Sequence, residues 1–578
     1  MKISELSMIK RFSKLHIIYF ISFLTAFCSL VYELQYSQLL SVLYGNSVLR
    51  YSLTIGIYLF SLGLGSLSFR LFAGIENAKT LWISQMALAI IGPIGIVGIV
   101  WFDGLLFELF QLKAQSFALF VAHVPIVLTG VLAGIQIPLL SVIGNSIKKR
   151  TDMFVEVLGV DYFGSLVGAV LYGLFLYPRV GLIKTAFLIG LINVLLALSC
   201  VVFLKNRKIF YFVIVSLLVI FSVLNFKGAE IEKSIMRLYL TVSIEKEFAI
   251  KNEHLLTMMK QDGVVNASLN IPREKIEVDT HFNTSYQEVT KYFIDRGDGS
   301  SDECLKLSNH TNMCDSWANI YHEALVNVPV SFLKRQDEPY EVLLLGGGSL
   351  LPVRNLLNYN VNIDQVDIDS QFVDYAKTDP YFSKYHQNAY LDARWHIFYE
   401  DAYTFLKHNQ KKYDLVVMTL PGFGSDKLIH LGSVEFFDFL SRSMTDDGLM
   451  VTWEYGKINK DDYPQYQNSE VNDKHLKVLF KDMLEGGLKS YTMFYAFGKP
   501  MQIGGLKIDD GAVSPYDTFY LFSKRYENVQ PDFDASQYMQ KNKKYYENMQ
   551  WHSLEDLDLS EVRASHIFAP NYDIMTAF

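Results

Sequence analysis

The first part of the chain, up to about residue 226, consists mainly of apolar runs with few charges. About seven of these runs are long enough to cross a bilayer as helices. The first run is too long, and is followed by too many others, to be a cleaved signal peptide. The sequence therefore predicts a polytopic α-helical membrane domain of the cell (inner) membrane, with spans at residues 17–43, 51–72, 81–101, 117–143, 154–177, 182–204 and 209–226.

Small residues cluster within these runs, as at Gly63, Gly65, Gly164 and Gly168. Helices in lipid approach each other closely only through small faces. We therefore interpret these glycines as packing residues.

Three ionisable residues, Glu33, His123 and Asp161, also lie within the apolar runs. A charge inside a bilayer is expensive, so each needs a partner or a wet cavity. Arg179 is a candidate counter-ion for either carboxylate, and a structural ion pair and a substrate contact both stay open. His123 is interpreted as a hydrogen-bonded packing residue.

The rest of the chain has an ordinary soluble composition, and the net charge of -8 arises mainly there. This charge gives no reason to expect a nucleic-acid partner. We divide this part into a connector with a small β-rich portion (227–335), a Rossmann-like domain (336–530) and a C-terminal tail (531–578). Residues 280–294 are strand-like, residues 297–302 form a turn or loop, and a helix around residues 320–325 runs to Pro329.

From residue 340 onward, apolar strand patterns alternate with helical patterns. Such alternation predicts a doubly wound α/β sheet with its ligand at the carboxyl ends of the strands. The predicted strands are 342–345, 363–367, 395–399, 415–419 and 449–453, and the predicted helices are 350–359, 371–377, 402–408 and 433–444. Residues 491–497 and 518–522 are candidates for edge strands.

A glycine turn, Gly346-Gly347-Gly348, follows the first of these strands, and Asp367 ends the next strand about twenty residues later. Glycines let the backbone turn sharply and approach a ligand closely. A carboxylate at the end of the following strand is placed to accept hydrogen bonds from ribose hydroxyls. This layout predicts a nucleoside pocket, although the third glycine of a nicotinamide-type fingerprint is missing.

A second acidic position, Asp401, follows the third strand. Its carboxylate is placed to receive an adenine amino group. It is also placed to cap the helix that begins at Ala402. The two roles are compatible.

Short motifs in the C-terminal half resemble the spermidine synthase (polyamine aminopropyltransferase) family, which has the class I methyltransferase-type fold that binds S-adenosylmethionine. The N-terminal half is similar to the membrane segments fused to some bacterial members, through Leu30-Val31-Tyr32-Glu33-Leu34, Gly63-Leu64-Gly65-Ser66 and Asp161-Tyr162-Phe163-Gly164. The motifs of the C-terminal half are Ser285-Tyr286-Gln287, Tyr321-His322-Glu323, Leu345-Gly346-Gly347-Gly348, Val366-Asp367-Ile368-Asp369 and Glu400-Asp401-Ala402.

The resemblance implies two groups of site residues. S-adenosylmethionine, or its decarboxylated form, would be the cosubstrate, and Tyr321 and His322 would line the transfer site. The residues implied for binding the cosubstrate are Gln287, Gly346, Gly347, Gly348, Ser349, Asp367, Asp369 and Asp401.

The chain departs from the family where acidic residues are expected: Ser349 follows the glycine turn, Thr419 follows the fourth strand, and Gly422 stands where a second acid is common. An attacking amine must be neutral, and a carboxylate helps to take its proton. Thr419 carries no charge, so ordinary aminopropylation of putrescine is not expected. His322, Glu323 or Asp315 would then have to act as the base.

The membrane side of the C-terminal half is contested. Basic residues before the first run and in later loops place the N-terminus in the cytoplasm, so seven spans would put this half outside. Cys304 and Cys314, in a polar loop, are able to form a disulfide in an oxidising compartment. A cosubstrate made in the cytoplasm favours the interior instead, and we weight this second argument slightly more.

The leading hypothesis is a membrane-bound transferase that moves an aminopropyl or related alkyl group to an amine or another, amphipathic acceptor. The alternatives are a catalytically inactive nucleoside sensor and a transporter with a regulatory soluble domain, the latter motivated by Glu33 and Asp161. We find no compact His/Cys ligand set and therefore expect no metal. The expected partners are a small-molecule or amphipathic acceptor and the lipid bilayer, with a homo-oligomer left open.

Overall fold

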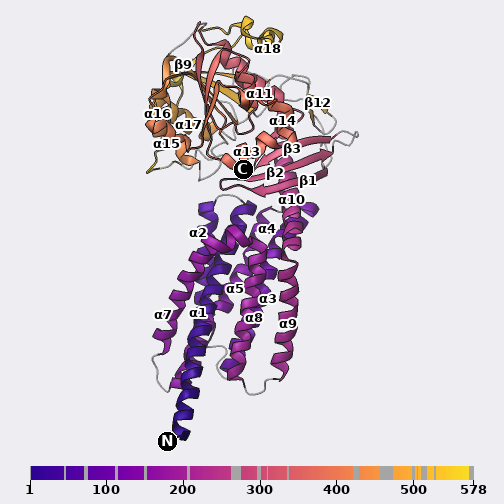
Figure 1. The fold of residues 1–578 in the computed structure, drawn as a ribbon, viewed down its shortest axis with the longest axis vertical. Coiled ribbons are helices and arrows are strands. Elements are labelled where there is room, and N and C mark those ends of the chain that lie inside the picture. Colours follow the sequence, from indigo (N-terminus) through magenta and orange to yellow (C-terminus); the bar gives the residue numbers. More distant parts are fainter. Residues whose placement is uncertain are drawn as a thin grey trace. The chain divides into compact units, whose positions relative to one another are not determined.

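The computed structural model divides the chain into two compact units, Met1–Lys246 and Glu247–Phe578, which are described separately (Figure 1). The first unit extends past residue 226, where the sequence placed the boundary of the membrane domain. The structure describes residues 2–44, 47–69, 76–110, 115–148, 153–204, 208–261, 275–295, 301–308, 310–334, 337–420, 428–455, 473–496, 501–503, 506–508, 517–525, 529–569 and 571.

The first unit is helical, as predicted. Six of its helical segments are long and apolar enough to cross a membrane, and one further bent pair passes the same test. The helices are α1 (Lys2–Tyr44), α2 (Ser47–Ser68), α3 (Asn77–Phe110), α4 (Gln115–Ala122), α5 (Val124–Gly134), α6 (Gln136–Lys148), α7 (Met153–Leu171), η3 (Tyr172–Val180), α8 (Leu182–Cys200), η4 (Val201–Phe203), α9 (Lys208–Phe226) and α10 (Gly228–Gln261).

The seven predicted runs coincide with these helices, with two differences in detail. The fourth run is built from three successive helices, α4, α5 and α6. The seventh run is followed, after a 65° bend, by α10; Phe210–Phe226 and Gly228–Lys246 pass the test for a membrane span only together, as a broken span or a re-entrant loop. The sequence did not signal this continuation, because α10 carries far more charge than α9.

Close helix contacts in the first unit use the small residues that the sequence singled out. A Cβ on Gly65 would lie 2.1 Å from the Val131 carbonyl oxygen, and one on Gly164 would lie 2.2 Å from the Phe23 carbonyl oxygen. Gly168 packs against Phe27 in the same way. These three assignments are confirmed, whereas Gly63 faces open space.

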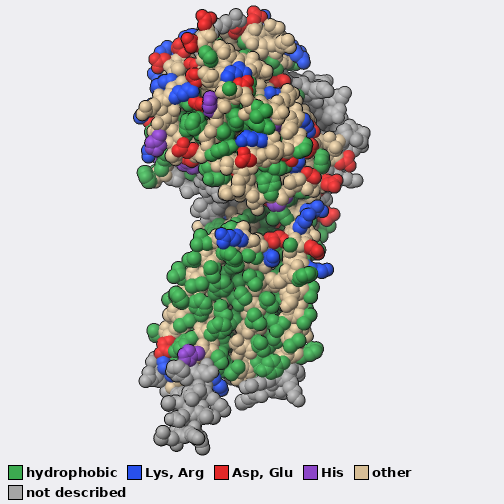
Figure 2. Space-filling model, viewed as in Figure 1, with side chains coloured by type: hydrophobic (Ala, Val, Ile, Leu, Met, Phe, Trp, Pro, Cys, Tyr) green, Lys and Arg blue, Asp and Glu red, His purple; other side chains and the backbone are tan. Residues whose placement is uncertain are grey.

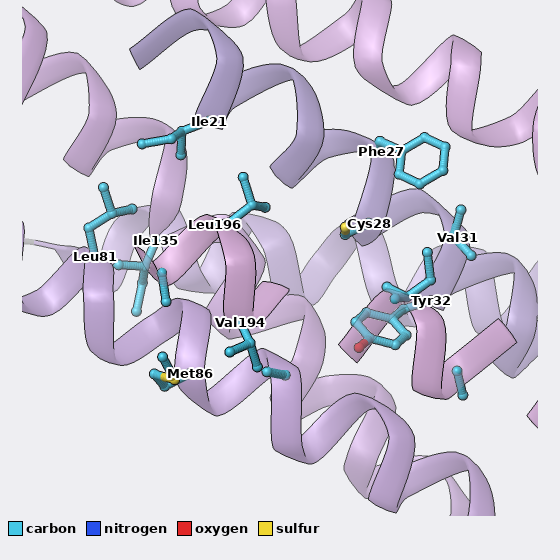
Figure 3. Close-up of a cluster of buried hydrophobic side chains, with 14 of the residues drawn as sticks. Ile21, Phe27, Cys28, Val31, Tyr32, Leu81, Met86, Ile135, Val194 and Leu196 are labelled. Carbon is cyan, nitrogen blue, oxygen red and sulfur yellow. The ribbon is translucent and has the colours of Figure 1, made fainter. Parts of the chain in front are cut away.

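Apolar side chains line both the inside and the outside of the helical unit. Its core includes Ile21, Cys28 and Tyr32 of α1, together with residues of α3 and α8 and with Ile135 between α5 and α6 (Figure 3). Large side chains such as Phe60 and Phe120 are exposed on its surface. Figure 2 shows hydrophobic side chains covering most of the helical face in view.

The second unit begins with a four-stranded antiparallel sheet in the order β1-β2-β3-β4. Its strands are β1 (Lys275–Asn283), β2 (Glu288–Asp295), β3 (Ser301–Leu307) and β4 (His310–Cys314). Cys304 and Cys314 face each other across β3 and β4 and form a disulfide. The expectation that these cysteines lie in a polar loop was therefore wrong. The predicted loop 297–302 falls partly outside the described residues, and its last two residues begin β3.

Helix α11 (Ala318–Ser331) leads into an eight-stranded sheet in the order β14-β10-β13-β9-β8-β5-β6-β7. The helix continues past Pro329, where the sequence predicted its end. The strands of the sheet are β5 (Tyr340–Leu345), β6 (Val361–Val366), β7 (Trp395–Phe398), β8 (Tyr413–Met418), β9 (Met444–Tyr455), β10 (Ser490–Tyr495), β13 (Asp517–Ser523) and β14 (His552–Ser553).

Helices and short connecting elements separate these strands. They are α12 (Leu351–Leu356), α13 (Ser370–Thr378), α14 (Pro380–His386), η5 (Ala389–Leu391), α15 (Ala402–His408), η6 (Ile429–Gly432), α16 (Val434–Ser443) and α17 (Asp473–Glu485). A small hairpin of β11 (Met501–Ile503) and β12 (Leu506–Ile508) lies between β10 and β13 in the chain. The elements after β13 are η8 (Phe533–Ala535), α18 (Gln537–Lys541), α19 (Lys543–Tyr546) and η9 (Leu554–Asp556).

The sheet has the doubly wound arrangement that the sequence predicted. Strands β7, β6, β5, β8 and β9 are parallel, and the chain leaves β5 toward β6 on one side and reaches β8 on the other. The strand order therefore reverses between β5 and β8. Folds of this type bind their ligand at the carboxyl ends of the strands beside this reversal. Neither of the two predicted edge strands lies at the edge, because β13 pairs antiparallel with β9 and β10, and β10 also pairs antiparallel with β14.

Candidate active site

The glycine turn follows β5 directly at this reversal. Gly346 and Gly347 have φ angles of 79° and 78°, a region that side chains disfavour. A Cβ on Gly348 would lie 2.8 Å from the Phe372 ring and 3.0 Å from a carboxylate oxygen of Asp367. The turn therefore needs glycine for its conformation and for its close approach to the next strand. Ser349, which follows the turn, is half-buried.

Asp367 lies at the carboxyl end of β6, beside the turn. One of its oxygens accepts a hydrogen bond from the Asp369 backbone N–H at 2.9 Å. The Gly348 backbone also donates to this carboxylate. Burial nevertheless raises the pKa of Asp367 to about 6. The glycine turn and Asp367 are thus adjacent, and we call Gly346, Gly347, Gly348 and Asp367 together the cradle.

Gln287 and Asp369 bind each other rather than standing apart. One Asp369 oxygen accepts hydrogen bonds from Gln287 Nε2 at 2.9 Å and Thr284 Oγ1 at 2.6 Å. The other caps α13 by accepting from the Phe372 backbone N–H at 3.1 Å. Asp369 is almost completely buried. The turn between β1 and β2 is thereby fastened to α13 next to the cradle.

Asp401 follows β7 and caps α15, one of the two roles that the sequence allowed. One of its oxygens accepts from the Thr404 backbone N–H at 2.9 Å and from its hydroxyl at 3.1 Å. The other lies 3.4 Å from His430 Nε2. The hydrogen bond from His430 is the main influence that lowers the pKa of Asp401. Sequence reasoning missed His430, which reaches this position from an element distant in the chain.

Tyr321 lies in an aromatic cluster on the other side of the reversal. Its ring centroid is 4.9 Å from Phe519, 5.7 Å from Trp317 and 6.4 Å from Trp453. Helix α11, which carries Tyr321, packs on β8 and β9. No local pattern predicts the contacts with Trp453 and Phe519, because these two residues come from neighbouring strands far apart in the chain.

His322 is buried, and its ring Nδ1 lies 2.7 Å from the Ala318 carbonyl oxygen. A carbonyl accepts only, so Nδ1 carries the proton and Nε2 keeps its lone pair. Burial lowers the pKa of His322 to about 4. The side chain is therefore a neutral hydrogen-bond acceptor near pH 7 and a weak base.

The two carboxylates proposed as alternative bases have other neighbours. Glu323 is influenced by Arg354 of α12 and Lys541 of α18, and burial raises its pKa. Asp315 forms an ion pair with Lys384 at 2.8 Å and accepts a hydrogen bond from Tyr385. Tyr321 and Glu323 also point from different faces of α11, because residues two apart on a helix do not face the same way.

Thr419 lies at the carboxyl end of β8, next to the glycine turn. Its hydroxyl donates to the Leu345 carbonyl oxygen at 3.0 Å. A Cβ on Gly346 would lie 3.0 Å from the same hydroxyl oxygen. The hydroxyl is therefore directed into the junction of β5 and β8. Gly422, the second departure from the family pattern, lies outside the described residues.

The site residues thus form two groups at one end of the sheet. The cradle of Gly346, Gly347, Gly348 and Asp367, with Asp401 beyond it, follows β5, β6 and β7. Thr419 follows β8, and the aromatic cluster contacts β9 and β13. Among the described residues, one potential metal-ligand group is found, Asp302 with Cys304 and Cys314, and its sulfurs are bonded to each other.

Comparison with known proteins agrees with the motif-based resemblance. Residues 318–480 match the spermine/spermidine synthase domain. Polyamine aminopropyltransferase 2 of Aquifex aeolicus is 28% identical over 74% of this chain and 77% of its own length. Polyamine aminopropyltransferase 1 of Streptomyces coelicolor is 27% identical over 74% of this chain and 73% of its own length. A spermidine synthase crystal structure with the transition-state analogue AdoDATO aligns with a TM-score of 0.34 and 14% identity, covering 51% of this chain and 93% of that one.

Proposed function

We propose that this chain, which carries a spermine/spermidine synthase domain over residues 318–480 and is related to polyamine aminopropyltransferases, is itself an aminopropyl-transferring enzyme. Its donor would be decarboxylated S-adenosylmethionine and its acceptor an amine. The observation that carries this proposal is the placement of the glycine turn, Asp367 and Asp401 at the ends of β5, β6 and β7. S-adenosylmethionine itself is retained as the competing donor.

The cradle fits the nucleoside part of such a donor. The glycine turn leaves no room for side chains and presents bare backbone at the reversal of the sheet. The Asp367 carboxylate, beside this backbone, would accept hydrogen bonds from the ribose hydroxyls. Asp401 would accept a hydrogen bond from the adenine amino group through Oδ1, the oxygen that lies near His430. The bound sulfonium supplies an electrophilic carbon and a neutral thioether leaving group.

The transfer forms one carbon–nitrogen bond and breaks one carbon–sulfur bond. The neutral amine attacks the carbon beside the sulfonium, the electron pair of the broken bond goes to sulfur, and the proton leaves from nitrogen. His322 Nε2 is the group that would accept a hydrogen bond from the amine N–H and hold its lone pair toward the carbon. The low pKa of His322 assigns it to orientation rather than to removing a proton from a free ammonium ion.

The acceptor would differ from putrescine in its charge or shape. Thr419 offers no carboxylate, and its hydroxyl is held by Leu345. The aromatic cluster around Tyr321 instead offers ring faces, which attract an amine through its apolar carbon chain and through cation–π contact. An amphipathic amine suits such a site.

The first unit would anchor the enzyme in a membrane, since six of its helices have the length and composition to cross one. The Cys304–Cys314 disulfide supports placing the second unit in an oxidising compartment. This argues against the cytoplasmic placement that cosubstrate supply favours, and it agrees with the basic residues near the N-terminus and an odd number of spans.

Untargeted mass spectrometry after incubation with each isotope-labelled donor form tests the proposal. We expect labelled aminopropyl adducts of an amine with decarboxylated S-adenosylmethionine. Labelled methyl adducts with S-adenosylmethionine alone would contradict it. Donor binding without any product would contradict it too and would identify a nucleoside sensor.

A further inference from the structure

A segment near the C-terminus, residues 559–569, packs on the second unit, and we call it the strap. It lies beyond residues 318–480, which match the family domain. Leu559 and Val562 belong to the same buried cluster as residues of α17, and the Lys481 ammonium of this helix donates to their carbonyl oxygens at 3.3 and 2.6 Å. The completely buried Asp482 carboxyl group accepts from the Ser565 backbone N–H at 2.7 Å. The strap is therefore fixed to α17 at three of its residues.

The end of the strap also holds the first turn of α16. The Ser565 carbonyl oxygen accepts from the Val434 backbone N–H at 3.0 Å. Glu435 Oε1 lies 3.2 Å from His566 Nδ1, and its Oε2 accepts from the Ile567 backbone N–H at 3.4 Å. The first backbone N–H groups of a helix have no partner inside the helix, so a carbonyl from elsewhere in the chain satisfies Val434. The strap thus fixes both the backbone and a side chain where α16 begins.

The start of α16 connects the strap with the donor site. Ser433, the N-cap residue of α16, donates from its hydroxyl to the His430 carbonyl oxygen at 2.8 Å. The His430 ring then lies with Nε2 3.4 Å from Asp401 Oδ1 and with its centroid 6.2 Å from that of Tyr403 in α15. Helices α15, α16 and α17 pack in this order (Figure 1). Hydrogen bonds and a short stretch of backbone therefore join the strap to the carboxylate that would receive the adenine amino group.

We propose that the strap is a positioning element of the donor site. By fixing the start of α16, it holds His430 against Asp401, and this contact directs Asp401 Oδ1 toward the adenine amino group. A carboxylate oxygen has two lone pairs, so Oδ1 is able to accept from both His430 and the amino group. Glu435 and His566 are the positioning residues, because they link the strap to α16 and are not part of the cradle. The inference rests on the proposed function, since it concerns the same donor nucleoside.

Calorimetry of the full-length protein with methylthioadenosine, the nucleoside product of the proposed reaction, tests the strap. We expect His566→Ala and Glu435→Ala each to weaken binding about threefold to tenfold, as is usual for coupling within one hydrogen-bond network. Glu435→Gln keeps an oxygen that accepts from the Ile567 N–H, so it should retain most of the affinity. Glu561→Ala removes an exposed carboxylate of the strap itself and should bind as the wild type does. The side chains of Glu435 and His566 are 38% and 43% exposed, so the melting temperature should stay nearly unchanged.

Two comparisons separate positioning from a general loss of structure. The purine riboside analogue of methylthioadenosine lacks the amino group, so His566→Ala should bind this analogue as tightly as the wild type does. In a His430→Ala background, His566→Ala should have little further effect on methylthioadenosine, because the side chain that the strap positions is already gone. Equal weakening toward the two nucleosides, additive effects of the two substitutions, or unchanged affinity in both His566→Ala and Glu435→Ala would overturn the role of the strap.

The strap and the proposed function fail in different ways. Wild-type protein that binds methylthioadenosine and forms aminopropyl adducts, but shows additive effects of His566→Ala and His430→Ala, removes the strap inference alone. Coupled effects in a protein that forms no adduct support the strap and remove only the transferase proposal. Wild-type protein that does not bind methylthioadenosine at all would overturn both.

Discussion

The Thr419 hydroxyl donates a hydrogen bond to the Leu345 carbonyl oxygen at 3.0 Å, and this contact fixes the side chain at the position where related enzymes are expected to hold a carboxylate. The same carbonyl accepts from the Thr419 backbone N–H at 2.9 Å. The threonine thus closes the junction of β5 and β8, and no acidic side chain stands at this point.

Replacing Thr419 by an aspartate should give the enzyme aminopropyl transfer to putrescine. A carboxylate in Thr419→Asp would be repelled by the Leu345 carbonyl and would turn toward the acceptor. Because a positioned base contributes about 10²–10⁴-fold, we expect spermidine formation to rise at least about tenfold above a low wild-type rate. Chromatography of derivatised polyamines measures this.

Thr419→Val is the matched control. It removes the hydroxyl without adding charge, so it should cost about 1 kcal/mol of stability and leave turnover of the native acceptor unchanged. Efficient spermidine formation by the unmodified protein would contradict the role assigned to this position.

The donor cradle predicts the effect of removing either nucleoside carboxylate. Asp367→Ala and Asp401→Asn should each weaken donor binding by about 1.5–3 kcal/mol in calorimetry, since each loses a hydrogen bond to a charged group. Asn at position 401 keeps an oxygen able to cap α15, which separates donor contact from helix stability. Asp374→Ala, at an exposed residue of α13, should have no effect. Wild-type affinity in both Asp367→Ala and Asp401→Asn would remove this pocket assignment.

Donor affinity should depend on pH through Asp367. Burial raises its pKa to about 6, so the carboxyl is ionised above this pH and protonated below it. The ionised form accepts ribose hydroxyls more strongly. Affinity should therefore fall as pH decreases through about 6 and level off above it.

Asp367→Asn removes the titrating group, so its weaker affinity should be nearly independent of pH between about 5 and 7.5. An equal pH dependence in wild type and variant would assign the effect to another group.

Much of the fold was predictable because its elements have strong local signals. The apolar run at β5 and the glycines after it determine a buried strand and a sharp turn without tertiary information. The position of β13 was not predictable in this way, because it depends on pairing with β9 across a long stretch of chain. The cysteine strands were missed because β3 carries the charged residues Asp302, Glu303 and Lys306, which suggested a polar loop although Asp302 and Lys306 are buried.

The site was predictable in its residue types and less so in its contacts. Asp367 and Asp401 follow strands that the sequence identifies, so the parallel sheet brings them to one edge. The direction of the Thr419 hydroxyl depends on a carbonyl of the adjacent strand, which no local pattern encodes. His430 and Trp453 reach the site from segments far away in sequence, and their contacts arise only in the folded sheet.

The disulfide predicts the redox environment of the second unit. Protein isolated from cells with a thiol-blocking reagent present should yield a linked Cys304–Cys314 peptide in non-reducing mass spectrometry. A reporter fused after Phe578 should then be active outside the cytoplasm. Free, alkylated thiols at both positions together with a cytoplasmic reporter would contradict this placement and agree with donor supply from inside.

In the proposed reaction, the second unit transfers an aminopropyl group to an amine with loss of the thioether. The most direct measurement is the molar ratio of methylthioadenosine released to aminopropylated amine formed by the purified full-length protein from labelled decarboxylated S-adenosylmethionine. We expect a ratio of about one, from the balance of the bonds made and broken, and loss of both products in Asp367→Ala. Methylthioadenosine without the amine adduct, or no turnover with any amine despite tight donor binding, would contradict it.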